Sequence, residues 1–189
     1  MKRLVVFLIA CLASPATASA NTTAKINQLH GEIIRSDDLE VIPEIKRAPK
    51  SVRRELLCLS LNIYHEARGS TSKDQWGVAL VTLNRLSHRN FGDTVCQVVW
   101  ERRDAKKAPQ FSWTAYTVKR LTPEEPDAWT EAQRIAYLAH VDEDMHDFTN
   151  GSLHYYNPKL VKKTPVWVKS AVAKKRIGKH VYMKLASNR

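Results

Sequence analysis

The chain has 189 residues, and its 30 lysines and arginines outnumber its 19 aspartates and glutamates, giving a formal net charge of +11 at pH 7. Acidic residues are frequent enough to exclude a polycationic tail, so the composition indicates a folded domain with a basic surface. Such a surface attracts polyanions over a long range. The length suits one domain with a sizeable core.

Residues 1–20 have the layout of a secretory signal. Lys2 and Arg3 precede an apolar run that ends at Leu12, and small residues lead up to Ala20. The apolar run is too short for a membrane-spanning helix. We therefore expect cleavage after Ala20 and an exported protein, in the periplasm or outside the cell, with a charge of +9 once Lys2 and Arg3 are removed.

Two alternatives for this segment stay open. Leu8-Ile9-Ala10-Cys11 also fits a lipoprotein cleavage box, which would attach lipid to Cys11, and an uncleaved signal could act as an anchor. In each case the protein is exported, which argues against nucleic acid as the partner of the basic surface. Anionic cell wall, lipopolysaccharide or phospholipid is the expected partner, and peripheral contact with a membrane fits the same charge. The sequence leaves the oligomeric state open.

Two cysteines, Cys58 and Cys96, remain after the signal. In an oxidising compartment they can form one intramolecular disulfide, and the alternative is two small buried apolar residues. Two cysteines this far apart predict no metal site.

Residues 21–50 read as a polar lead-in, broken by Pro43 and Pro49, and the packed domain is expected to span 51–189. Apolar residues at helical spacing from Val52 to Tyr64 predict a largely buried helix that stops at Gly69.

Three further helices follow. Ser72 and Gln75 have the layout of a capping box for a second helix. Asp93 or Thr94 can cap a short third one. Residues 125–141 predict a fourth, with four inward residues: Trp129, Ile135, Ala136 and Leu138.

After the turn signal Asn150-Gly151 the pattern becomes strand-like, in "SLHYYNP" and later in "KHVYMKL". The sequence therefore predicts an α+β domain that is mainly α, with a small β element.

The histidines do not predict a metal site. His65-Glu66 would need a second histidine at position 69 to match a zinc protease, and Gly69 stands there. Apart from the pair His140 and His146, the other histidines lack short ligand spacing. All are interpreted as surface or core residues: His88, His140, His146, His154 and His180. No nucleophile-elbow pattern is present either. We expect no metal and no cofactor.

Glu66 is the candidate for chemistry, because it ends a buried helix beside Tyr64, His65 and Arg68. The alternative is an ordinary surface ion pair. Two aromatic-rich loops with neighbouring amides and hydroxyls suit a sugar chain, whose faces are apolar and whose edges are polar. Core packing is again the alternative. The candidate substrate-binding residues are Tyr64, Arg68, Gln110, Phe111, Ser112, Trp113, Tyr155, Tyr156 and Asn157.

Six blocks in order resemble the SleB-type cell-wall hydrolases: "CLSLNIYHEARG", "GVALVTLNRL", "FGDTVCQVV", "QFSW", "TNGSLHYYNP" and "RIGKHVY". The resemblance runs from about Glu55 to Lys184. It implies a fold like that of lysozyme and the lytic transglycosylases, peptidoglycan as the substrate, and Glu66 as a general acid. Many members have a cysteine where this chain has Pro109, which leaves the Cys58–Cys96 pairing open.

The resemblance sets a chemical requirement on Glu66. A glutamate with the ordinary pKa of about 4.3 is ionised at neutral pH, so an acid that protonates a glycosidic oxygen must be held partly dry. Arg68 would lower that pKa by direct pairing, and we therefore expect it to point elsewhere. No second carboxylate stands out, since Asp74, Asp93 and Asp104 read as cap or surface residues.

A single acid favours lytic transglycosylation of the β-1,4 bond between N-acetylmuramic acid and N-acetylglucosamine, in wall remodelling or lysis. Two alternatives remain: an N-acetylmuramoyl-L-alanine amidase, against which the missing metal ligands argue, and a non-catalytic module that binds cell wall or lipopolysaccharide. A basic group near the C-terminus suits attachment to an anionic wall: Lys162, Lys163, Lys174, Lys175 and Arg176.

Overall fold

The computed structural model describes residues 41–101, 109–115, 122–142, 144–164 and 166–185. The expected signal at 1–20, most of the lead-in, and Asp104 lie outside these ranges. Within them the elements follow in this order: α2 (Pro43–Arg47), α3 (Lys50–Ala67), α4 (Ser72–Leu86), α5 (Val95–Val99), the 3-10 turn η1 (Ser112–Ala115), α7 (Pro126–Val141), β1 (His154–Tyr156), the 3-10 turn η2 (Val166–Ser170), β2 (Ala171–Ile177) and β3 (His180–Leu185).

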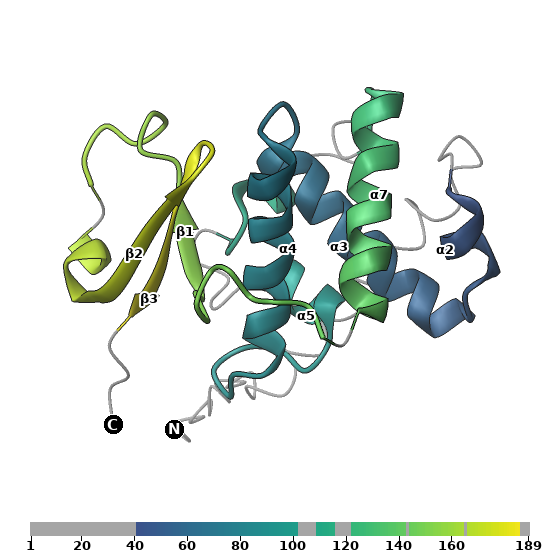
Figure 1. Ribbon diagram of the computed structural model, residues 1–189, viewed down its shortest axis with the longest axis horizontal. Helices are drawn as coiled ribbons and strands as arrows, with labels where there is room; N and C mark the ends of the chain where they lie inside the picture. The colour runs from purple at the N-terminus through teal and green to yellow at the C-terminus, as the bar shows by residue number, and fades with distance from the viewer. Residues whose placement is uncertain (1–40, 102–108, 116–121, 143, 165, 186–189) are drawn as a thin grey trace, which may run out of the picture. The chain divides into compact units, whose positions relative to one another are not determined.

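Helix α3 is the central element, and it contacts α4, α5 and α7 (Figure 1). Its apolar residues face these neighbours on several sides, and Leu56, Leu59 and Ile63 are each 1% exposed or less. The prediction of a largely buried helix is therefore confirmed. Gly69 follows the helix with φ +71, a left-handed conformation that L side chains rarely adopt, so it ends the helix as expected.

The caps of the next two helices differ in how well the sequence predicted them. Helix α4 begins at Ser72, but its N-cap is Thr71, whose hydroxyl accepts a hydrogen bond from the backbone N–H of Asp74. The predicted capping box with Ser72 is wrong by one residue. Thr94 caps α5 as predicted and accepts from the N–H of Gln97.

Helix α7 buries Trp129, Ile135 and Ala136, as predicted. Leu138 was expected on the same face, and this is wrong because its side chain is 48% exposed. The buried positions of this helix recur every three or four residues, and Leu138 falls on the opposite side of that stripe.

The packed domain begins before the expected boundary at residue 51. Helix α2 lies against α3 and α7, and Ile45 is completely buried. The backbone N–H of Ile42 donates to Oε1 of Gln133 on α7 at 3.0 Å. The two prolines start helices instead of ending a structureless segment, since Pro43 is the first residue of α2 and Pro49 is the N-cap of α3.

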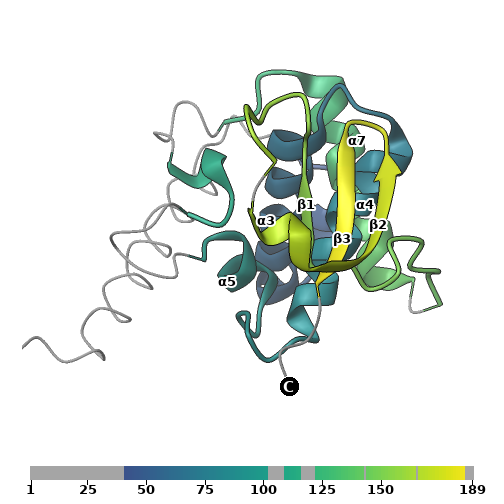
Figure 2. The same ribbon diagram turned by 90° about the vertical axis from the view of Figure 1, so that its left-hand side faces the viewer.

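The three strands form one antiparallel sheet in the order β1-β3-β2. Figure 2 shows this sheet in front of the helices. The sequence predicted β1 and β3 but not β2. The residues from Val172 to Arg176 do not alternate between apolar and polar types, and all five are exposed, so this strand lacks the pattern of a half-buried strand. Lysine and arginine on an edge strand are a common protection against unwanted pairing with other chains.

The sheet packs on α4 through Val81, Ile177 and Tyr182. Gly77 of α4 permits this approach, because a Cβ atom there would lie 2.6 Å from the Tyr182 ring. Tyr182 is thereby placed with its hydroxyl over the first turn of α4.

Cys58 of α3 and Cys96 of α5 are joined by a disulfide, with their Cα atoms 5.3 Å apart. The bridge ties the short α5 to the helix that carries Glu66. Among the described residues, no helix has the length and apolar character needed to cross a membrane.

Candidate active site

Glu66 lies in the last turn of α3 and opens into a cleft of about 600 Å³ between the helices and the sheet. Most residues predicted to bind substrate line this cleft, although the sequence separates them into three segments. The described residues that line it are Tyr64, His65, Glu66, Arg68, Ser112, Trp113, Thr122, Glu124, Glu125, Tyr155, Tyr156, Asn157, Leu160, Val161 and His180.

Burial raises the pKa of Glu66 above its ordinary value. His180, the hydroxyl of Tyr155 and the guanidinium of Arg85 act in the opposite direction, and burial outweighs all three. The carboxyl therefore holds its proton to a higher pH than a glutamate in water does. This is the property that a general acid requires.

Arg68 does not pair with Glu66. Its Nε lies 2.9 Å from Oε2 of Glu125, and its guanidinium carbon lies 4.7 Å from the centre of the Tyr64 ring. The expectation that Arg68 points elsewhere is confirmed. Glu66 is thus spared the cation that would lower its pKa most directly.

The hydroxyl of Tyr64 fixes the start of α7. It accepts hydrogen bonds from the backbone N–H groups of Glu124 and Glu125, at 3.0 and 3.2 Å, and donates to Oε2 of Glu125 at 2.9 Å. Tyr64 is 3% exposed, and burial raises its pKa. Its position favours a structural role at the edge of the cleft.

Trp113 and His65 form one wall of the cleft. Their rings stack with centroids 4.6 Å apart, and the indole N–H of Trp113 donates to Oδ1 of Asn62 at 3.1 Å. These two contacts fix the Trp113 ring, which is 2% exposed. His65 was not predicted as part of the site, although it stands beside Glu66 in the sequence.

Gln110 and Phe111 do not line the cleft, contrary to the sequence-based prediction. Phe111 is 3% exposed, and its ring lies 5.0 Å from the guanidinium carbon of the buried Arg85. The backbone N–H of Gln110 donates to the carbonyl of Glu101. Of this loop, Ser112 and Trp113 reach the cleft, because the 3-10 turn η1 directs successive side chains to different sides.

Tyr155, Tyr156 and Asn157 line the cleft from the sheet side, as predicted. The hydroxyl of Tyr155 is buried and makes no hydrogen bond of ordinary geometry within the described ranges. Burial and the nearby charge of Glu66 raise the pKa of Tyr155 well above its usual value. This hydroxyl therefore stays protonated beside the Glu66 carboxyl.

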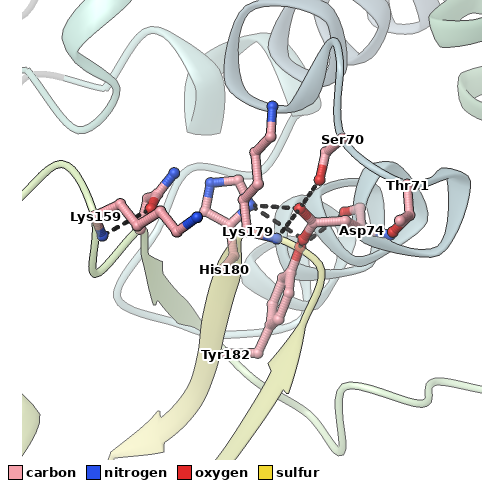
Figure 3. A network of polar contacts seen from close by, with 8 residues as sticks. Ser70, Thr71, Asp74, Lys159, Lys179, His180 and Tyr182 are labelled. Atoms are coloured by element: carbon pink, nitrogen blue, oxygen red, sulfur yellow. Dashed lines mark hydrogen bonds and ion pairs between the residues drawn. The ribbon is translucent and has the colours of Figure 1, made fainter.

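Asp74 is at the centre of a buried polar network, which Figure 3 shows. Both oxygens of its carboxylate lie 3.1 Å from Nδ1 of His180. It accepts further hydrogen bonds from the backbone N–H of Lys179 at 2.9 Å, from the hydroxyl of Tyr182 at 2.7 Å and from Ser70. Asp74 is completely buried, so its interpretation as a cap or surface residue is wrong.

The network keeps Asp74 ionised. Burial alone would raise the pKa of this carboxyl, but the hydrogen bonds from His180, Ser70 and Tyr182 outweigh it and lower the pKa below the usual value. The turn between β2 and β3 allows this contact, since Gly178 has φ +54 and a Cβ atom there would lie 2.7 Å from the Cβ of Asp74.

His180 is the main residue of the site that the sequence did not reveal. It is 4% exposed and lies 106 residues from Asp74 in the chain. No local spacing connects the two, and only the packing of β3 against α4 brings them together. Within the described ranges, no group of three or more histidine, cysteine, aspartate or glutamate side chains is arranged to hold a metal ion.

The fold is lysozyme-like. It is a helical domain with a small antiparallel sheet, it has a cleft beside that sheet, and the central helix ends in a partly buried carboxyl. A family model described as Cell Wall Hydrolase matches residues 69–183, and the chain belongs to this family. The matched range begins three residues after Glu66.

Curated relatives support this assignment. The chain is 27% identical to the spore cortex-lytic enzyme of Oceanobacillus iheyensis over 164 residues, which cover 87% of this chain and 54% of that protein. It is 31% identical over 122 residues to the enzyme of the same name from Bacillus cereus, covering 65% of this chain and 41% of the relative. The chain thus spans about half the length of the curated relatives it matches, or less.

Two solved structures are similar to this one. The catalytic domain of the germination-specific lytic transglycosylase SleB from Bacillus anthracis matches with a TM-score of 0.54 and 26% identity, over 76% of this chain and 100% of that domain. The catalytic domain of the Bacillus cereus SleB protein matches with a TM-score of 0.53, 26% identity and 98% coverage of that domain. The predicted fold class is confirmed.

Proposed function

We propose that this protein degrades peptidoglycan by cleaving the β-1,4 bond between N-acetylmuramic acid and N-acetylglucosamine, with Glu66 as the general acid. The observation that carries the proposal is a partly buried glutamate, with a raised pKa, in a cleft lined by aromatic side chains. Family membership and the SleB-like fold give independent support.

The reaction begins when the protonated carboxyl of Glu66 gives its proton to the oxygen between the two sugars. The bond from that oxygen to C1 of the muramic acid breaks, and C1 acquires oxocarbenium character. In a lytic transglycosylase the C6 hydroxyl of the same sugar bonds to C1 and loses its proton to the Glu66 carboxylate. The products are a 1,6-anhydro-muramic end and a free C4 hydroxyl, and Glu66 regains its proton.

The other carboxylates of the cleft favour transglycosylation over hydrolysis. The described lining contains two of them besides Glu66, namely Glu124 and Glu125. Glu125 is held by Arg68 and by the hydroxyl of Tyr64, which leaves it poorly suited to activate water. Glu124 is exposed at the rim. One solved neighbour is described as a lytic transglycosylase, which agrees with this preference.

The place of action follows from the substrate. Peptidoglycan lies outside the cytoplasmic membrane. A secretory signal at residues 1–20 would export the protein to that side of the membrane, which agrees with this function. We propose that the exported domain acts on the wall in remodelling or in lysis, with the basic surface attracting the anionic polymer.

Mass spectrometry of purified sacculi digested with the protein tests the proposal. We expect soluble muropeptides with anhydro-muramic ends and no new reducing sugars. Reducing ends would replace transglycosylation by hydrolysis, with Glu124 as the first candidate for the base. Free peptides with intact glycan strands would mean an amidase, and binding without release would mean a non-catalytic wall-binding module.

A further inference from the structure

The Asp74–His180 pair adjoins the cleft but has no part in the proton transfer at Glu66 described above. His180 lines the cleft together with Glu66 and Tyr155, and its ring centroid lies 5.0 Å from that of Tyr155. Nδ1 of His180 lies 3.1 Å from both carboxylate oxygens of Asp74 (Figure 3), and Asp74 does not line the cleft. A buried carboxylate behind a histidine that faces a cleft usually orients the ring and selects its tautomer.

The hydrogen bonds around Asp74 determine which ring nitrogen carries the proton. Three other donors surround this carboxylate: the backbone N–H of Lys179, the hydroxyl of Tyr182 and the hydroxyl of Ser70. An ionised carboxylate only accepts hydrogen bonds, so Nδ1 of His180 must be the donor in this contact. In the neutral ring the other nitrogen, Nε2, is then an acceptor. Because Nδ1 faces Asp74, Nε2 is the ring nitrogen that is left to contact a group bound in the cleft.

A neutral ring suits a protonated Glu66 better than a charged ring does. A positive charge on His180 lowers the pKa of Glu66. An imidazolium beside this carboxyl would shift it toward its ionised form, whereas a neutral ring leaves the protonated form that the reaction needs undisturbed. This step rests on the proposed function.

We propose that His180 presents Nε2 as a fixed hydrogen-bond acceptor to an uncharged donor, an N–H or O–H group, of the amino sugar bound beside Glu66, and that Asp74 is the positioning residue that holds this tautomer. His180 is then a substrate-binding residue, and Asp74 acts through it. A neutral acceptor of this kind orients the sugar without adding a charge next to Glu66.

Two substitutions at position 180 separate this role from a structural one. His180→Asn places an amide N–H near the position of Nδ1, so it retains the bond to Asp74 but leaves no group at the position of Nε2. His180→Gln places an amide near Nε2 and gives up the bond to Asp74. His140→Asn, on the exposed face of α7, is the matched control.

If Nε2 contacts the sugar, His180→Asn keeps the melting temperature of the wild type while its kcat/KM on soluble glycan strands falls by about 10- to 100-fold. His180→Gln then retains more activity than His180→Asn at equal folded fraction. Equal activity of His180→Asn and wild type, or a Gln variant less active than the Asn variant, would show that the ring only supports the Asp74 network.

The tautomer can be measured without any enzyme activity. In 15N-labelled wild type, the imidazole nitrogen shifts of His180 should report a proton on Nδ1 and an unprotonated Nε2 at the pH of the activity assay. Asp74→Asn should move the proton to Nε2, because the amide can donate to Nδ1. A proton on Nε2 in the wild type, or a doubly protonated ring, overturns the inference. Wild-type protein that leaves sacculi intact would instead overturn the proposed function, and the two failures are thus distinguishable.

Discussion

Arg68 pairs with Glu125, with Nε 2.9 Å from Oε2, although it stands only two residues from Glu66 in the sequence. Arg68 is the residue after the last turn of α3, where the chain leaves the helix with extended backbone angles. Its side chain therefore points away from Glu66, and its guanidinium group lies over the face of the Tyr64 ring. The helix end separates the acid from the nearest cation in the sequence.

Arg68→Gln should accordingly leave the pH dependence of Glu66 unchanged. The ion pair is exposed, with side chains 40% and 60% accessible, so its loss should change the free energy of unfolding by less than about 1 kcal/mol. Activity at several pH values and thermal unfolding check both points. A shift of the alkaline limb of activity to higher pH would show that Arg68 does act on Glu66, since removing a cation raises the pKa of a neighbouring carboxyl.

Glu66→Gln should lower the activity on purified peptidoglycan by about 10²- to 10⁴-fold, the usual contribution of general acid–base catalysis. Glutamine preserves the size and hydrogen bonding of the side chain but cannot deliver a proton to the leaving oxygen. Release of soluble muropeptides over time is the measurement, and Glu44→Gln on the exposed face of α2 is the control. A folded Glu66→Gln protein with full activity would remove this residue from the mechanism.

The same substitution should stabilise the protein at neutral and alkaline pH. The folded-state pKa of Glu66 is raised by burial, so the native state binds this proton more tightly than the unfolded chain does. Its stabilising contribution is complete below the unfolded pKa of about 4.3 and is lost as the pH rises through the folded pKa. Urea unfolding should show Glu66→Gln more stable than wild type above that pKa, with the difference shrinking in acid. A constant difference at all pH values would contradict the assignment.

Loss of the Cys58–Cys96 bridge should lower the free energy of unfolding by about 2–4 kcal/mol. The bridge joins residues 38 positions apart, and without it the unfolded chain gains conformational entropy because it is no longer closed into a loop. Denaturant unfolding of the double serine variant measures this cost. Thiol counting on denatured, non-reduced exported protein should find no free thiol at these positions. Two free thiols would show that the cysteines pack as reduced residues instead.

Binding to sacculi should weaken as salt increases. The exposed basic residues of β2 lie on an edge strand, and charges at a surface are screened beyond about 10 Å at 0.1 M salt. Replacing Lys174 and Arg176 by glutamine should reduce the amount of protein that sediments with sacculi at low salt. Lys175 is left unchanged because its Nζ donates to the carbonyl of Phe148. Salt-independent binding would count against an electrostatic contribution.

The sequence by itself determined the features that depend on local periodicity and on local backbone chemistry. The apolar spacing before Tyr64 predicted the buried helix, Gly69 predicted its end, and Asn150-Gly151 predicted a turn in which both residues have positive φ. Glu66 could be proposed as the acid because it stands at the end of that helix and because the block around it resembles the cell-wall hydrolases. These features depend on residues within one or two helical turns of each other.

Tertiary structure alone decided which distant residues share the cleft. His180 reaches the site because β3 packs on α4, and Asp74 is buried because the glycine turn before β3 closes over it. Phe111 and Trp113 lie two residues apart in one aromatic block, yet Phe111 packs on Arg85 and Trp113 faces the cleft. In an irregular loop, the local sequence does not determine which side chains pack on the core and which face the cleft. Contacts between segments far apart in the sequence determine this.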